Sequence, residues 1–173
     1  MKRLGSLAAM VGLCGGLVAQ ADEPSKPSAE TKATFSITGL HCPPCTRTVE
    51  SSLSRVPGVK SARVDWVTKS AKLTFDESKV TVQGITSTIA TTPHMMGGGM
   101  SYGSFLALSV PELKDDASAA KAKEALAKLN GVTRVSAFPQ QHTMSVQLAA
   151  GKDVTTKQLI DVLEAAGMKA ATY

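Results

Sequence analysis

The sequence predicts an α+β fold in which a βαββαβ unit occurs twice in tandem. Its apolar positions repeat with a shift of 73 residues, which brings Gly58-Val59 onto Gly131-Val132 and becomes 74 after one inserted residue. Within each copy, apolar residues alternate over short segments and recur at helical spacing in between, the two periodicities of strands and helices. A repeat that contains both periodicities favours a duplicated unit in which helices pack on a sheet.

In the first copy we expect three strands, at residues 34–37, 59–66 and 69–75. Cys45, Val49 and Leu53 recur at helical spacing and define the buried stripe of a helix that ends at Pro57-Gly58. A second helix is marked by three apolar residues, Val82, Ile85 and Ile89. Residues 93–104 begin where a fourth strand is due, so that strand is expected to be short, absent or supplied from elsewhere.

The second copy is expected to repeat this order, with elements at residues 105–110, 117–130, 132–138, 143–148, 155–166 and 168–173. Thr155 and Gln158 have the spacing of a capping box, which places the start of its last helix. This order is the ferredoxin-like arrangement. The predicted domains are therefore residues 33–96 and 105–173, joined by a Gly-rich linker at 97–104.

The N-terminus has the parts of a secretory signal peptide. Lys2-Arg3 is followed by an apolar stretch too short to span a bilayer and by Ala19-Gln20-Ala21, a small-residue cleavage site. Removal of residues 1–21 would leave a flexible leader, 22–32, and a periplasmic or secreted protein. Membrane association would require lipidation of Cys14, because no later segment is apolar enough to cross a membrane.

The composition excludes some functions. Only 4% of the residues are aromatic, which argues against a large buried cofactor pocket. The net charge of +5 falls to +3 without Lys2 and Arg3, and the remaining basic residues are scattered. We therefore expect no nucleic-acid binding.

Cys42 and Cys45 are the cysteines that remain after cleavage. A disulfide that closes so short a loop would stabilise the fold little, so a chemical role is favoured. The pair stands at the start of the first helix, where the helix dipole and unpaired N–H groups favour thiolates. Two thiolates suit a soft ion with few ligands, such as Cu(I), whereas the further Cys or His of a structural zinc site are missing.

The segment from Gly39 to Cys45, Gly-Leu-His-Cys-Pro-Pro-Cys, resembles the GMxCxxC loop of the heavy-metal-associated domain family. This family includes copper chaperones, N-terminal domains of copper-transporting ATPases and periplasmic mercury-binding proteins. The resemblance covers residues 33–96, with Leu40 in place of the usual Met. It implies that Cys42 and Cys45 are metal ligands and that the ion passes to a metal-accepting protein, such as a P-type ATPase, by ligand exchange.

Other residues near this loop are weaker candidates. His94 aligns with a position that faces the metal in some bacterial copper chaperones, although Pro93 replaces the family's Gly. Met95, with Met96 and Met100, offers thioethers that suit Cu(I). His41 is expected to face solvent. The second copy has Asp115 and Ser118 at the cysteine positions, so it is expected to be degenerate and to lack a soft-metal site, with His142 on the surface and Met144 in the core.

Three alternatives remain open. Hg(II) or Zn(II) could replace Cu(I), and mercury binders would share the fold and the compartment. A thiol-disulfide oxidoreductase would also use a Cys-Pro-Pro-Cys pair at a helix start, but the Trp of thioredoxin sites is missing. An interaction module with an incidental cysteine pair is the third alternative. We expect a metal carrier, not an enzyme, of unknown oligomeric state.

Overall fold

A computed structural model of the chain describes residues 30–149 and 151–173. Its elements are β1 (Glu30–Thr38), α1 (Pro43–Ser54), β2 (Val59–Asp65), β3 (Ser70–Asp76), α2 (Val82–Thr91), β4 (Gly103–Ser109), α3 (Asp116–Ala127), β5 (Val132–Phe138), a 3-10 turn (Pro139–Gln141), β6 (Thr143–Leu148), α4 (Thr156–Ala165) and β7 (Ala171–Thr172). The predicted signal peptide lies outside the described residues. The last residues of the predicted leader, from Glu30 to Lys32, belong to β1.

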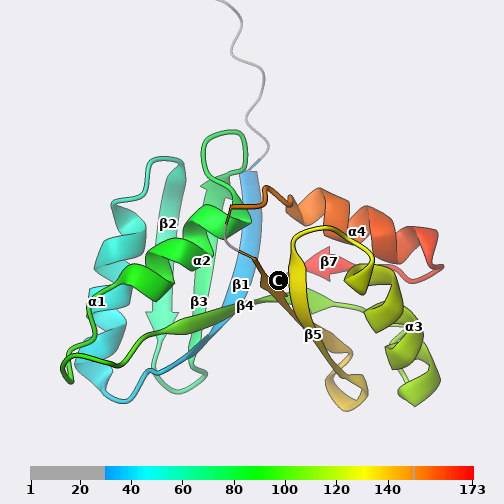
Figure 1. Ribbon diagram of the computed structural model, residues 1–173, viewed down its shortest axis with the longest axis horizontal. Coiled ribbons are helices and arrows are strands. Elements are labelled where there is room, and N and C mark those ends of the chain that lie inside the picture. Colours follow the sequence, from blue (N-terminus) through cyan, green and yellow to red (C-terminus); the bar gives the residue numbers. More distant parts are fainter. Residues whose placement is uncertain (1–29, 150) are drawn as a thin grey trace, which may run out of the picture.

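The two copies form one sheet. Its strands follow the order β2-β3-β1-β4-β6-β5, and β7 pairs with β4 off this path. Figure 1 shows β1 and β4 side by side at the centre, with α1 and α2 toward one end and α3 and α4 toward the other. Each half has the predicted βαββ order followed by a helix, so the predicted fold class is confirmed. The strands of both halves belong to one continuous sheet.

The strand β4 completes the sheet of the first copy. It runs antiparallel to β1, with Thr34 opposite Ala107 and Thr38 opposite Gly103. This is the edge of β1 where a fourth strand of the first copy would lie, and residues 93–102 contain no strand. Thr34 and Ala107 are equivalent positions of the repeat, so the copies are joined about an approximate twofold axis through this pair.

The repeat extends to details of the backbone. Gly58 and Gly131 have φ angles of 97° and 110°, a left-handed conformation that glycine adopts without strain. Their carbonyls accept hydrogen bonds from the N–H groups of Asp76 and Ala149, at 2.9 and 2.7 Å. A register shift follows Val59 in β2 and Val132 in β5. These matches confirm that the second unit is a copy of the first.

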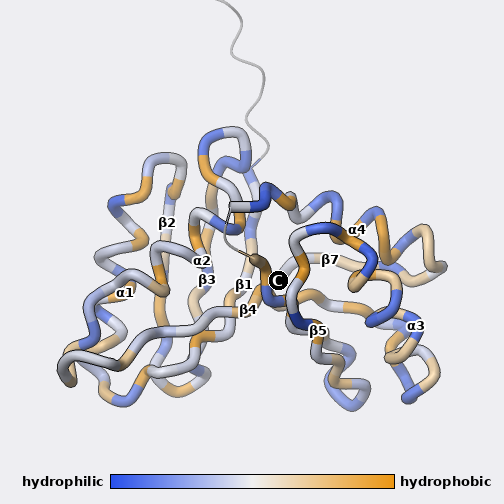
Figure 2. The backbone as a smooth tube through the Cα atoms, in the orientation of Figure 1, coloured by the Kyte–Doolittle hydropathy of each residue, from blue (hydrophilic) through white to orange (hydrophobic). Residues whose placement is uncertain are grey.

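The helices begin where their sequences provide caps. The Thr81 side chain accepts from the Gly84 N–H at the start of α2. Thr155 and Gln158 form the predicted capping box of α4. Figure 2 shows hydrophobic residues in short patches along the helices, the pattern of helices with one buried stripe.

A single hydrophobic core lies under both copies. Phe35 on β1 and Leu106 on β4 are fully buried opposite each other at the join, where each contributes roughly 1.5–3 kcal/mol by burial. Polar contact adds to this join, because the Thr156 N–H at the start of α4 donates to Glu77 Oε1 of the first copy, at 2.9 Å. Within the described ranges, no helix has both the length and the apolar character needed to span a bilayer.

Candidate metal centre

The two cysteines stand at the start of α1, as the sequence predicts. Cys42 is the N-cap residue, with extended φ and ψ angles of −143° and 149°, and it is half-buried. Cys45 lies in the first turn and is fully buried on the inward stripe with Val49 and Leu53. The helix therefore holds one sulfur in the core and presents the other closer to solvent.

Cys42 and Cys45 are joined by a disulfide in this structure, with their Cα atoms 5.3 Å apart. The pair is therefore in its oxidised form, in which neither sulfur is a thiolate. Among residues 30–149 and 151–173, no group of three or more Cys, His, Asp or Glu side chains is arranged to hold a metal ion. Among these residue types in the described ranges, the two cysteines are therefore the ligand candidates at this helix start.

The helix start offers fewer donors to the sulfurs than the sequence suggested. Pro43 and Pro44 have no N–H group, and the Cys45 N–H donates to the Cys42 carbonyl at 3.0 Å. The helix dipole remains as a source of positive potential near the sulfurs. The expectation of several unpaired N–H groups at the first turn is therefore wrong for these three positions.

Lys69 holds the loop that carries Cys42, and sequence reasoning missed it. Its Nζ donates to the Leu40 carbonyl at 2.8 Å and lies 2.9 Å from the centre of the Trp66 ring. Its carbonyl accepts from the Ile37 N–H at 2.7 Å, and its φ angle of 52° turns the hairpin back toward the loop. The residue thus links the β2–β3 turn to β1 and to the loop, and it places a positive charge beside the loop.

His94 reaches the same loop from the other side. Its Nε2 donates to the Gly39 carbonyl at 2.9 Å, while its Nδ1 accepts from the Met96 N–H at 3.2 Å. Because a carbonyl only accepts, these contacts fix the neutral tautomer with the proton on Nε2. Both ring nitrogens are engaged, so His94 would have to give up a contact to bind a metal ion. Its role as a ligand stays a prediction.

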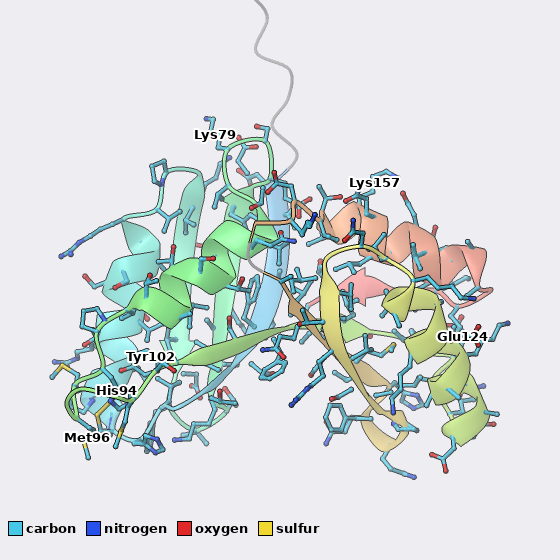
Figure 3. All side chains as sticks on the ribbon, viewed as in Figure 1. Lys79, His94, Met96, Tyr102, Glu124 and Lys157 are labelled. Carbon is cyan, nitrogen blue, oxygen red and sulfur yellow. A yellow bond between two sulfur atoms is a disulfide. The ribbon has the colours of Figure 1, made fainter. Side chains whose placement is uncertain are left out.

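Aromatic packing supports this position of His94. Its ring lies 4.7 Å from the ring of Tyr102 and 5.7 Å from that of His41, between centroids. Tyr102 is buried, and burial raises the pKa of its hydroxyl. A Cβ atom on Gly39 would lie 2.8 Å from the Ser101 carbonyl, so this glycine lets the linker pass directly over the loop. Figure 3 shows His94, Met96 and Tyr102 together near the start of α1.

Met95, Met96 and Met100 lie in the segment between α2 and β4 and are 59%, 60% and 51% exposed. They are thus free of the core. His41 is exposed, as expected.

The second copy keeps the shape of the loop without cysteines. Asp115 is the N-cap of α3, and its carboxylate accepts from the Ser118 N–H at 2.8 Å. The hydrogen bond from the Ser118 N–H and, to a smaller extent, the one from the Ser118 hydroxyl lower the pKa of Asp115. His142 has a φ angle of 50°, and its Nδ1 donates to the Leu113 carbonyl at 2.8 Å. This contact is equivalent to that of Lys69 Nζ with the Leu40 carbonyl in the first copy. His142 is exposed and Met144 is fully buried, as predicted.

Comparison with known proteins gives a consistent picture. The heavy-metal-associated domain family matches the chain twice, over residues 34–92 and 107–169. The periplasmic component of a mercuric transport protein from Serratia marcescens is 37% identical over 59 residues, which are 34% of this chain and 65% of the relative. A copper-transporting ATPase from Oryza sativa subsp. japonica is 29% identical over 133 residues, which are 75% of this chain and 13% of that protein.

Among solved structures, a crystal structure of oxidized MerP from Ralstonia metallidurans CH34 is 33% identical, with a TM-score of 0.39. The match covers 45% of this chain and 97% of that one.

Proposed function

The chain belongs to the heavy-metal-associated domain family, and from this membership we propose that its first copy carries one Cu(I) ion between Cys42 and Cys45. One observation carries the proposal. The two cysteines are the N-cap and a first-turn residue of one helix, with Cα atoms 5.3 Å apart, so both sulfurs can approach a single ion. Two thiolates are a ligand set that Cu(I) accepts.

Binding requires the reduced pair. The disulfide has to accept two electrons, from a dithiol reductant, before either sulfur can act as a thiolate ligand. We infer that the metal-free protein alternates between a disulfide form and a reduced form, and that only the reduced form takes up the ion. The compartment in which we place the protein, the periplasm, is oxidising, which makes this step a control point.

Transfer of the ion would begin at Cys42. Cys42 is half-buried whereas Cys45 is fully buried, so an incoming thiolate from a partner reaches an ion on the Cys42 side first. The partner then displaces Cys42 and afterwards Cys45. We infer that this partner is a metal-accepting protein such as a P-type transporting ATPase, which makes the chain a carrier with no catalytic step of its own.

The direct test is a competition titration of the reduced protein with Cu(I) against a chelator. We expect one ion per chain, and we expect Cys42→Ser and Cys45→Ser each to abolish tight binding. Ser118→Ala, at the position equivalent to Cys45, is the matched control and should bind as the unaltered protein does. Tight binding that persists in both cysteine variants would exclude the thiolate site.

Hg(II) is the second candidate cargo, because several curated relatives are mercuric transport proteins. It takes the same two thiolates. The exposed methionines and His94 next to the loop favour copper, since thioethers suit Cu(I). Parallel titrations with the two ions, each against its own competitor, rank them. A chain that prefers mercury would bind Hg(II) tightly and lose Cu(I) to a weak competitor.

The disulfide also motivates the oxidoreductase alternative. A protein of that class should catalyse the reduction of insulin disulfides by a small dithiol. We expect the rate with this chain to equal the rate with the Cys42→Ser/Cys45→Ser variant. A faster reaction that depends on the cysteines would favour the oxidoreductase.

A further inference from the structure

The methionines of the described residues fall into two groups. Met144 and Met168 belong to the core, at 0% and 4% exposure, whereas Met95, Met96 and Met100 are all more than half exposed. The three exposed methionines share one segment, between α2 and β4. The other exposed large apolar side chains of the described ranges are Val67, Phe138 and Tyr173, which lie in three different segments. A local cluster of exposed apolar side chains calls for a binding explanation.

The backbone of this segment brings its two ends together. Turns occur at residues 95–96 and again at 98–99, and the Gly97 N–H donates to the His94 carbonyl at 3.3 Å. Gly97 and Gly99 have φ angles of 109° and 91°, which glycine adopts without strain. Apart from the glycine itself and its chain neighbours, no atom lies within 4 Å of where a Cβ would be on Gly97, Gly98 or Gly99. The stretch between Met96 and Met100 is therefore open to solvent and leaves room for an ion beside it.

Anchors on both sides keep this segment beside the cysteine loop. His94 hydrogen-bonds the Gly39 carbonyl, and the buried Tyr102 packs against His94. The methionine segment is thus held at both ends beside Gly39, in the loop that carries Cys42, and Figure 3 shows His94, Met96 and Tyr102 together there.

We propose that Met95, Met96 and Met100 form a second binding site for a monovalent soft cation, Cu(I), that works while Cys42 and Cys45 are oxidised. A thioether sulfur is neutral and cannot form a disulfide, so its ability to bind Cu(I) does not depend on a thiol reductant. Three neutral sulfurs attract a cation less than two thiolates do. An ion held by the methionines would therefore move to the cysteine pair once that pair is reduced. No bond other than the metal–sulfur contacts forms or breaks.

The test uses residues 22–173, the chain without its predicted signal peptide and therefore without Cys14, with the disulfide intact. The probe is Ag(I), because Ag(I) keeps its oxidation state under non-reducing conditions. With 13C-labelled methionine methyl groups, NMR should show the signals of Met95, Met96 and Met100 shifting and saturating at one Ag(I) per chain. The signals of Met144 and Met168 should stay in place. Mg(II), a hard ion, should move none of them.

A triple variant, Met95→Leu, Met96→Leu and Met100→Leu, removes the thioethers from exposed positions with little change in volume. We expect it to bind Ag(I) at least about tenfold more weakly, a change of about 1.4 kcal/mol. Met144→Leu, the same substitution in the core, should bind Ag(I) as before. Unmoved methyl signals, or a triple variant with undiminished affinity, would overturn the proposal. Because the locked disulfide contains no thiolate, neither result depends on whether the reduced cysteines bind copper.

Discussion

The helices α1 and α3 begin at equivalent positions of the two copies but are started by different chemistry. In the second copy, Asp115 and Ser118 cap α3 reciprocally. In the first copy, Cys42 makes no side-chain hydrogen bond to the turn of α1, which relies instead on Pro43 and Pro44. A capping residue commonly stabilises a helix by about 1 kcal/mol. The first copy thus forgoes a stabilising contact at the position where it carries two sulfurs.

What the two copies share is equally informative. Lys69 and His142 both adopt a left-handed conformation and both hydrogen-bond a loop carbonyl, that of Leu40 or Leu113. The Ile37 and Val110 N–H groups donate to the carbonyls of these same two residues. Because the contacts persist without cysteines, they belong to the fold of the loop, and the cysteines were placed on, or lost from, a loop that folds without them.

The largest effect is expected from moving the cysteines to the second copy. In a Cys42→Ser/Cys45→Ser background, Asp115→Cys with Ser118→Cys should restore the binding of one Cu(I) per reduced chain, since the helix start and the carbonyl contact are already in place. A chelator competition measures this gain. If the transplanted pair binds no ion, features particular to the first loop, such as Gly39, are required as well.

A smaller effect is expected when the join between the copies is weakened. Leu106→Ala removes a fully buried side chain from β4, and such changes cost about 2–5 kcal/mol. Because β4 completes the sheet of the first copy, this loss of stability should also destabilise the first copy. Trp66, the single tryptophan of the chain, lies in the first copy and reports its unfolding. The midpoint of urea denaturation, followed by Trp66 fluorescence, should move to a lower urea concentration.

Val67→Ala is the control for this experiment, because Val67 is 84% exposed and should leave the midpoint unchanged. If Leu106→Ala leaves the midpoint of the Trp66 fluorescence transition unchanged, the two copies unfold independently.

Next in size is the loss of the Lys69 contact. Lys69→Leu keeps an aliphatic side chain and adds no sulfur, but it removes the hydrogen bond to Leu40 and the charge over Trp66. One such hydrogen bond is worth about 0.5–1.5 kcal/mol, so Cu(I) affinity should fall by roughly two- to tenfold. His142→Leu makes the equivalent change in the second copy and should leave the affinity as it was. Equal affinities for both variants would show that Lys69 does not position the metal loop.

The smallest effect concerns the cap of α3. Its hydrogen bonds to Ser118 lower the pKa of Asp115 in the folded chain, so the carboxylate stabilises the fold above the unfolded pKa of about 3.9. That stabilisation is lost as the pH falls through the lower folded pKa. Asp115→Ala should therefore lower the urea midpoint at pH 7 and have less effect near pH 2. An equal loss at both pH values would contradict a role for the charged form.

Local signals in the sequence predicted most elements. The strands expected at 132–138 and 143–148 have those bounds in the structure, and the pair Thr155 and Gln158 caps α4 as predicted. The shared position of β4 was not predictable, because pairing between β1 and β4 depends on how two copies meet in space. Lys69 was missed because a lysine in a hairpin turn carries no local signal. Its alignment with His142 through the repeat was the available clue.

The position of β4 has a consequence for the order in which the chain can fold. The first copy contains the cysteines, yet its sheet is closed by a strand that ends at Ser109. When the chain is synthesised, or crosses a membrane, starting from its N-terminus, β1 appears before β4. One edge of β1 therefore stays unpaired until β4 has been synthesised or has crossed. Over this interval the sheet beside Cys42 and Cys45 is incomplete, so the pairing of β4 sets the earliest time at which the proposed metal site can form.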